Sequence, residues 1–336
     1  MKLDLLLVNP VLEDAATTVR LAEDAGFDGA WTTEVAGNPF LSCATAAQAT
    51  SRIDIGTAVA LAFVRSPMVT ALTAWELQRA SRGRFILGLG TQVKRHNERR
   101  FSVPFATPLA KLREQVLALR QMYAAFQGDA PLKFRGEHYR LDMLPDFFNP
   151  GPIQFAPPPT YLAAVNPVAL RMSGEVADGV HIHPFHSARY LREVALPEID
   201  AGLCRAGRDR ADFTVSAQVL TLVGQGEEGR RMDEYIRTQL AFYGSTRTYR
   251  PPLELHGYGA LNDRLHELMA NGDQAGLLRA VPDELVPEFA VVADTWEEAA
   301  RKARERYDGL CDRISLYTLP PLADPSARKI TAAFAG

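Results

Sequence analysis

The feature that most constrains the fold is a repeated alternation of short apolar runs and longer helical segments along most of the chain. Each apolar run is continuous, which is typical of strands buried on both faces of a sheet. Between the first two runs, Val19, Ala22 and Ala25 recur at helical spacing, and Gly26 ends the predicted helix. Eight runs are predicted to be strands: residues 3–10, 29–34, 53–61, 84–90, 160–165, 178–185, 212–224 and 312–319.

A helix is predicted after nearly every strand, over residues 41–50, 67–81, 109–126, 168–175, 188–206, 227–242 and 296–307. Alternating strands and helices imply a parallel sheet with right-handed crossovers. Eight such units favour a (β/α)8 barrel, a TIM barrel, over a doubly wound sheet, and we expect one domain over residues 1–336. A dinucleotide-binding open sheet would carry glycines in its first strand-to-helix turn, and that turn, VNPVLED, has none.

Two segments do not follow the alternation and are predicted to be irregular insertions. Residues 128–159 are rich in Pro, Gly and aromatic residues, and we expect them to pack across one face of the core. Residues 244–292 are predicted to form short helices and loops, and long loops often serve as substrate walls. Their aromatic residues suggest an apolar or ring-containing substrate: Phe134, Tyr139, Phe147, Phe148, Tyr243, Tyr249 and Tyr258.

Composition and charge exclude several classes of partner. A net charge of −3 and a pI near 6.2 argue against nucleic acid, and the basic cluster at 94–100 is local. No run approaches the roughly 20 apolar residues of a membrane span, and the N-terminal run is too short for a signal peptide. The three cysteines are far apart, without the spacing of a zinc site or a disulfide framework. We therefore expect a cytoplasmic protein with no metal site.

In such a barrel the active site is formed at the carboxyl ends of the strands. The residues predicted there are Asn9, Glu34, Ala58–Val59, Gly90–Lys94, Ala163–Pro167, His181–His186, Ser216–Gln218 and Tyr317. Glu34 is the only carboxylate among them, and it can orient a hydroxyl or carry a proton. Alternatively, it caps a helix or pairs with Arg65.

Two of these strand ends have the features of an anion site. In LGLGTQVK, the glycines, Thr91 and Lys94 can offer N–H groups, a hydroxyl and a cation, although the spacing is not that of a Walker loop. In YLAAVNPVAL, Asn166 and Pro167 begin a helix, whose free N–H groups can hold a phosphate. The small residues at Ala58–Val59 would let a flat ring approach the backbone, or they serve barrel packing alone.

The HIHPFH segment places His181 and His183 on one side of a strand and His186 in the loop after it. No carboxylate or cysteine lies nearby in sequence, which disfavours a metal site. Two interpretations stay open: structural histidines, and histidines that contact substrate or transfer a proton.

The ordered motifs resemble those of the luciferase-like oxidoreductases, which use flavin or deazaflavin cofactors. The resemblance covers nearly the whole chain and is carried by residues 21–34, 52–71, 81–101 and 161–180. LGLGT followed by a polar loop and a helix is its most specific motif. TQVKRHNERRF, FFNPGPI and HPFH look most similar to an actinobacterial branch that is assigned to coenzyme F420.

The resemblance implies a (β/α)8 barrel, usually dimeric, that binds a tricyclic ring at the strand ends. It implies a cis peptide bond at Ala58–Val59 behind the ring and cofactor contacts from two further segments. These segments contribute Gly90, Thr91, Gln92, Ala163, Ala164, Val165, Asn166 and Pro167. Asn9, Glu34 and Lys94 are also expected to contact the cofactor, and Glu34, His181 and His183 are the catalytic candidates.

Two departures from the family pattern concern the proton donor. Many relatives have histidine directly after the acidic residue, whereas Val35, Ala36 and Gly37 follow Glu34 here. The first strand ends in Asn9, where some deazaflavin enzymes have glutamate. From the resemblance we expect hydride transfer between coenzyme F420 and a small organic substrate. The alternatives are a two-component monooxygenase that uses reduced FMN and a catalytically silent flavin-binding barrel.

Overall fold

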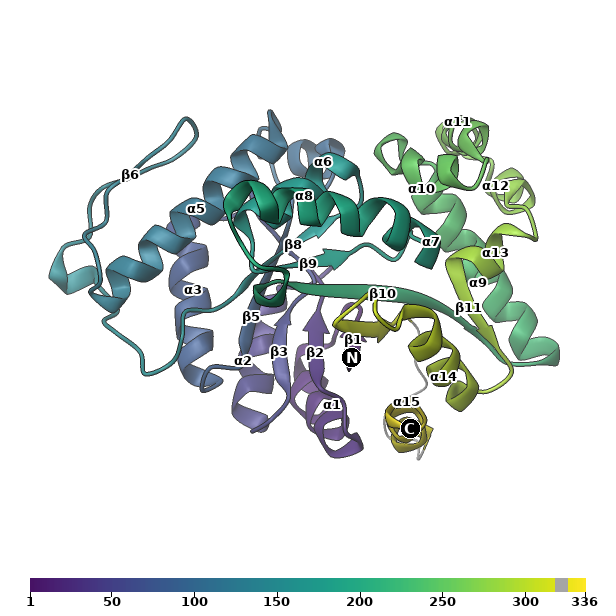
Figure 1. Cartoon of the computed structure of the whole chain (residues 1–336), viewed down its shortest axis with the longest axis horizontal. Helices are drawn as coiled ribbons and strands as arrows, with labels where there is room; N and C mark the ends of the chain where they lie inside the picture. Colours follow the sequence, from purple (N-terminus) through teal and green to yellow (C-terminus); the bar gives the residue numbers. More distant parts are fainter. Residues whose placement is uncertain (318–325) are drawn as a thin grey trace.

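The eight predicted strands close on themselves into a parallel barrel, which confirms the expected (β/α)8 fold (Figure 1). The computed structural model describes residues 1–317 and 326–336. The barrel strands are β1 (Lys2–Leu7), β2 (Gly29–Thr32), β3 (Asp54–Thr57), β5 (Phe85–Gly90), β8 (Thr160–Ala164), β9 (Gly179–Ile182), β10 (Thr214–Val223) and β12 (Arg313–Leu316). Pairing of β10 with both β9 and β12 closes the ring. The predicted last strand continues to 319, and its residues 318 and 319 lie outside the described residues.

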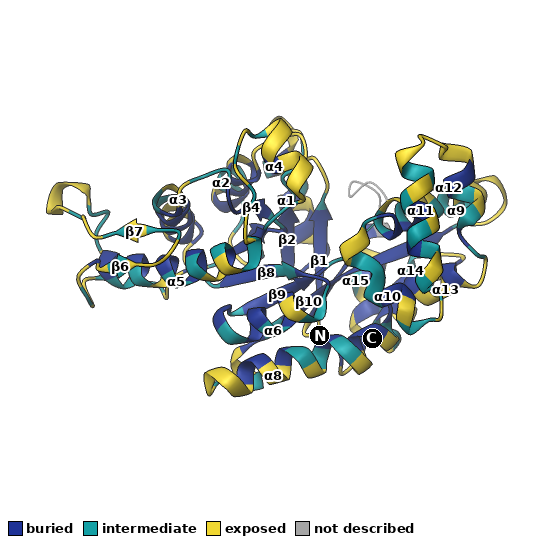
Figure 2. Ribbon diagram, turned by 90° about the horizontal axis from the view of Figure 1, so that it is seen from above, coloured by how far each residue is buried: buried dark blue, intermediate teal, exposed yellow. Residues whose placement is uncertain are grey.

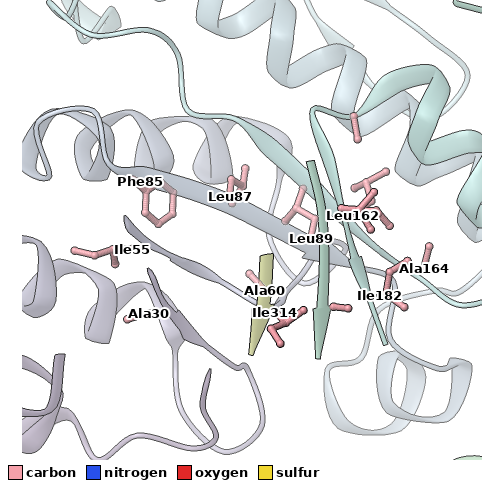
Figure 3. Packing of buried hydrophobic residues seen from close by; sticks show 14 of the residues in the cluster. Ala30, Ile55, Ala60, Phe85, Leu87, Leu89, Leu162, Ala164, Ile182 and Ile314 are labelled. Atoms are coloured by element: carbon pink, nitrogen blue, oxygen red, sulfur yellow. The ribbon is translucent and has the colours of Figure 1, made fainter. Parts of the chain in front are cut away.

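Side chains along each strand alternate between two environments, as the pleat of a strand requires. Ile55, Leu87 and Leu162 face outward into one large core between the strands and the helices, part of which is drawn in Figure 3. Trp31 and Tyr161 face inward and form a smaller cluster inside the barrel. The continuous apolar runs of the sequence therefore reflect burial on both faces.

Helices follow the strands where the sequence predicts them. They are α1 (Leu12–Ala25), α2 (Pro39–Ala49), α3 (Pro67–Ala80), α5 (Pro108–Gln127), α6 (Pro167–Val176), α7 (Ala188–Tyr190), α8 (Leu196–Ala206), α9 (Gly226–Gly244) and α14 (Trp296–Tyr307). Two further helices, α4 (Lys94–Arg100) and α15 (Ser326–Ala335), are not among the predicted ranges. One π-helical turn, Leu191–Ala195, joins α7 to α8. Side chains of Asn38, Ser66 and Asn166 cap α2, α3 and α6, each of which begins with proline. No helix in the described part of the chain has the length and apolar character needed to cross a bilayer.

The insertion at 128–159 extends outward along α5 (Figures 1 and 2). It contains a short hairpin, β6 (Phe134–Arg135) and β7 (Arg140–Leu141), and the carboxylate of Glu114 on α5 accepts three N–H groups of the turn. Its later part packs on α3 and α5, where Trp75 donates to the Gly151 carbonyl and Gln127 to the Ile153 carbonyl, each at 2.9 Å. Phe147 and Phe148 are 91% and 66% exposed, so their expected place in a pocket wall is wrong in this structure.

The segment at 244–292 contains the predicted short helices and one strand that was not predicted. It forms α10 (Arg250–Leu255), α11 (Gly259–Ala270), α12 (Gln274–Ala280), α13 (Leu285–Phe289) and a strand that the sequence analysis missed, β11 (Ala290–Ala293). This strand pairs with the outer half of β10, beyond the barrel. The short run AVVA lacks a flanking turn signal, because α13 leads directly into it. A second apolar core forms here, separate from the core around the barrel.

The amino ends of the strands are closed by a buried ion network. The guanidinium of Arg313 donates to both carboxylate oxygens of Asp4, at 2.8 Å each, and to Asp54 at 2.6 Å. The indole N–H of Trp31 donates to Asp4 at 2.9 Å. Burial alone would lower the pKa of Arg313, but the two carboxylates outweigh it and raise the pKa. A cavity of about 350 Å³ lies beside this network, at the end of the barrel opposite to the expected active site.

The Arg313 network predicts a large stability effect. Arg313→Met should lower the free energy of unfolding by about 3–5 kcal/mol, because it leaves the Asp4 carboxylate buried without its counter-charge. Urea unfolding with linear extrapolation measures the change. Arg231→Met is the matched control, since Arg231 pairs with Glu227 on the exposed surface, and it should cost less than about 1 kcal/mol. Equal losses in the two variants would contradict the prediction.

Candidate active site

The barrel opening at the carboxyl ends of the strands is here called the mouth. One side of the mouth is made of small residues. Ala58, Gly90 and Ala163 lie on the inner face near the ends of β3, β5 and β8, and are here called the small-residue wall. A Cβ added at Gly90 would lie 2.6 Å from Val59 Cγ2 and 3.4 Å from Ala163 Cβ. The peptide bond between Ala58 and Val59 is cis, as the resemblance implies. The wall therefore has no long side chain of its own, and the Val59 side chain packs against Gly90.

Glu34 holds this wall to the end of β2. Its carboxylate accepts two hydrogen bonds from the Arg65 guanidinium, at 2.9 and 2.5 Å, and one from the Leu61 N–H at 2.7 Å. The Arg65 guanidinium also lies 5.0 Å from the centre of the Phe40 ring. Glu34 thus pairs with Arg65, which was one of the two alternatives to a direct role, and both of its carboxylate oxygens accept hydrogen bonds.

The loop after β5 is organised from beneath by Asn97, which the sequence analysis did not single out. Asn97 is fully buried and donates its side-chain N–H groups to the carbonyls of Thr91, at 2.9 Å, and Val93, at 3.2 Å. Gln92 has a φ of 55° and a side chain that accepts the Val93 N–H. Lys94 is exposed, and its ammonium lies 3.8 Å from Glu98. The only local signal was an asparagine four residues after Val93, at the start of a short helix.

The segment after β8 begins α6 at the rim of the mouth. The Asn166 side chain accepts the Ala169 N–H at 2.9 Å, and Pro167 is the first helical residue, as predicted. The Val165 carbonyl accepts the Tyr190 hydroxyl at 2.8 Å. Ala164 faces outward into the main core, so Ala163 is the member of the AAV run that faces the mouth.

Asn9 lies at the rim and is exposed. It has a φ of 54°, and its side chain accepts the Ala36 N–H at 2.7 Å. Its own N–H donates to the Thr33 hydroxyl at 3.3 Å. Asn9 therefore orders the loop that follows β2, directly beside Glu34.

The three histidines around β9 are held in different environments. His181 is buried between the rings of Trp31 and Tyr161, and neither of its ring nitrogens has a partner among the described residues. Burial, with a smaller effect of Arg313, lowers its pKa to about 3. His186 donates from Nδ1 to the His183 carbonyl at 2.8 Å, and burial lowers its pKa to about 4.

His183 is the histidine that borders the mouth. Its Nδ1 accepts the Phe185 N–H at 3.1 Å, which assigns the ring proton to Nε2. Its ring centre lies 4.5 Å from that of Tyr243 and 4.7 Å from that of Tyr249. Burial, helped by His186, lowers the pKa of His183 to about 3. The ring is therefore neutral at pH 7 and acts as a hydrogen-bond donor there, not as a cation.

A glutamine connects the two halves of the barrel interior. Gln218 on β10 donates from Nε2 to the carbonyl of Ala58 on β3, at 3.5 Å.

The described residues contain no group of three or more side chains that could hold a metal ion. The arrangement at the mouth thus suits an organic ligand with a flat ring placed on the small-residue wall.

Comparisons with known proteins agree with this geometry. The profile of the family described as luciferase-like monooxygenase matches residues 4–313. An uncharacterised protein of Mycobacterium tuberculosis is 42% identical over 315 residues, which are 94% of this chain and 92% of that protein. The 5,10-methylenetetrahydromethanopterin reductase of Archaeoglobus fulgidus is 31% identical over 280 residues, with 81% and 80% covered.

Among solved structures, the coenzyme F420-dependent tetrahydromethanopterin reductase of Methanopyrus kandleri has a similar fold. Its TM-score is 0.75 at 20% identity, and the match covers 99% of this chain and 96% of that one. The (β/α)8 fold is thus shared over nearly the whole length of both chains.

The neutral state of His183 predicts a pH dependence of stability. Its folded pKa, about 3, lies below its ordinary value of 6.5, so from pH 6.5 down to about 3 only the unfolded chain binds this proton. Stability should therefore fall as pH falls, by about 1.4 kcal/mol per pH unit for this group. His183→Gln should reduce the slope of unfolding free energy against pH by that amount, measured by urea unfolding from pH 6 to 4.5.

The control for this experiment is Tyr243→Phe, which alters a neighbour of His183 without removing a group that titrates in this range. It should change the stability but keep the slope of the unmodified protein. An unchanged slope in His183→Gln would contradict the assigned pKa.

Proposed function

The protein is an enzyme of the luciferase-like monooxygenase family, and we propose that it transfers a hydride between coenzyme F420 and a small organic substrate. The observation that carries the proposal is the small-residue wall of Ala58, Gly90 and Ala163 at the catalytic end of the barrel. A tricyclic deazaflavin has the flat shape that such a wall accepts, and its C5 gives or takes the hydride. The F420-dependent relative with the same fold supports the choice of cofactor.

The residues present fit this cofactor at both of its ends. Gly90 has no room for a Cβ beside the Val59 side chain, so the ring side of the mouth is lined by small side chains. At the start of α6, Pro167 has no N–H and Asn166 accepts the N–H groups of Ala169 and Leu170, so this helix end offers the phosphate of the side chain the Val168 N–H and the positive end of the helix dipole. Lys94 on the rim adds a cation. We assign Thr91 and Gln92 to the cofactor because Asn97 fixes their loop.

The catalytic assignments follow from the contacts of each group. Glu34 acts on the cofactor through Arg65 and the Leu61 N–H, which it holds in place. His183 is the histidine at the mouth and donates from Nε2, whereas His181 lies deeper, behind Trp31 and Tyr161. A homodimer, expected from the resemblance, stays a prediction.

A two-component monooxygenase that uses reduced FMN is the second candidate. The family name and the shape of the small-residue wall favour it, because FMN carries a tricyclic ring of the same size. The alternative of a catalytically silent barrel rested on Val35, Ala36 and Gly37 after Glu34, and these residues lie in an exposed loop.

Cofactor titration separates the two candidates. The purified protein is titrated with oxidised coenzyme F420 and, separately, with FMN, and binding is followed by fluorescence. We expect micromolar binding of F420 and much weaker binding of FMN. Micromolar FMN binding without F420 binding would replace the first candidate with the second.

The placement of the ring predicts the effect of filling the wall. Gly90→Leu should weaken F420 binding more than about a hundredfold, because its side chain collides with Val59 and projects over the wall. Far-ultraviolet circular dichroism checks that the fold is kept. Gly37→Leu is the matched control, since a Cβ there meets nothing within 4 Å, and it should bind F420 as the unmodified protein does. Unimpaired binding by Gly90→Leu would refute this placement.

A further inference from the structure

We propose that the substrate of this site is an uncharged, ring-containing molecule whose carbonyl oxygen accepts a hydrogen bond from the paired hydroxyls of Tyr243 and Tyr317. The inference rests on the proposed function, because it places the substrate on the side of the mouth that the cofactor would leave open. It names the substrate class that the proposed function leaves undefined.

The surface in question consists of four side chains from distant parts of the chain. His183 follows β9, Tyr243 lies on α9, Tyr249 lies just before α10, and Tyr317 follows β12. All four are partly exposed, and they are here called the aromatic wall. The rings of Tyr243 and Tyr249 both lie against His183, so three of the four form one continuous aromatic surface.

Tyr317 connects the aromatic wall to the ring side of the mouth. It packs against the barrel-interior cluster that contains Leu6, Trp31 and Ala58. It also packs against the second core, to which Tyr243 and Tyr249 belong. A ligand placed on the small-residue wall at Ala58 would therefore have the aromatic wall as a neighbour.

The paired hydroxyls leave one proton free. The oxygens of Tyr243 and Tyr317 are 2.9 Å apart, so one hydroxyl donates to the other. Two phenols carry two protons, and a single bond between them uses one. The other O–H has no partner among the described residues, and it can donate to an oxygen of a ligand.

The aromatic wall is electrically neutral. Burial raises the pKa of Tyr243, followed by the effects of Tyr317, Tyr235 and Tyr249, and burial alone raises that of Tyr249 to about 12. Burial and His186 account for the lowered pKa of His183. No described carboxylate, lysine or arginine contributes to these three shifts.

This neutrality decides between classes of substrate. An anionic group on the aromatic wall would lose water without gaining a counter-charge, which is costly. A neutral carbonyl loses little and regains its hydrogen bond from the tyrosine pair. The rings of Tyr243 and Tyr249 are inclined to that of His183 by 88° and 55°, so the aromatic wall offers ring edges and faces to a ring-containing body.

Three naphthalene probes of similar shape test the proposal: 2-acetylnaphthalene, 2-isopropenylnaphthalene and 2-naphthoate. The first has a carbonyl, the second replaces its oxygen with CH2, and the third has a carboxylate. Equilibrium dialysis of the full-length protein, with ultraviolet detection, measures their binding. We expect the ketone to bind about fivefold to tenfold more tightly than the hydrocarbon, and more than tenfold more tightly than the carboxylate.

Tyrosine-to-phenylalanine variants test the paired hydroxyls. Tyr243→Phe and Tyr317→Phe each leave one free O–H at the pair, so each should keep most of the preference for ketone over hydrocarbon. The double variant has no hydroxyl there and should bind ketone and hydrocarbon equally. A merely structural role would not produce this difference between the single variants and the double variant. Thermal unfolding checks that each variant is folded.

The outcomes separate this proposal from the proposed function. Carboxylate binding as tight as ketone binding, no ketone binding up to its solubility limit, or an unchanged preference in the double variant would each overturn the tyrosine-pair assignment. Oxidised coenzyme F420 is titrated in parallel, and its affinity should be the same in all the tyrosine variants. In the unmodified protein, F420 binding without a preference for ketone over hydrocarbon would overturn only the substrate class. A ketone preference without F420 binding would overturn only the cofactor.

Discussion

The buried guanidinium of Arg313 joins three strands, and the shape of the mouth depends on that junction. Arg313 lies on the last strand and bonds to Asp4 on the first and Asp54 on the third. A parallel barrel has no local turn to hold its first and last strands together, so their pairing depends on contacts between residues more than 300 positions apart. Because the amino ends of the strands are fixed in this way, their carboxyl ends can carry loops and glycines and leave space for a ligand.

The order of strands and helices could be predicted from the sequence because short stretches of residues specify each element. Continuous apolar runs, helix caps and the Asn-Pro start of α6 each specify a conformation within a few residues. The glycines of FILGLG indicated a close backbone approach for the same reason. The four-residue β11 lacked such a signal, and only its pairing with the long β10 identifies it.

The side-chain partners could not be predicted in the same way. Asn97, the Arg313 network and the tyrosine pair depend on contacts whose members are separated along the chain or face each other across the barrel. Composition also misled in one place: Phe147 and Phe148 are aromatic residues in an insertion, yet they point into solvent. The aromatic residues of the two insertions suggested an apolar or ring-containing substrate, whereas the chain topology decides which of these residues lie near the mouth.

The ten-residue strand β10 has a consequence for how such a barrel can change over time. Its first half completes the ring, and its second half pairs with β11 next to the outer core under α9–α13 (Figure 1). Only Tyr317 among the described residues packs against both the outer core and the barrel-interior cluster that contains Ala58, so most residues of the outer core can be exchanged without repacking that cluster. One strand thus belongs to two packing units, so substitutions in the outer core can leave the inner face of the barrel in place.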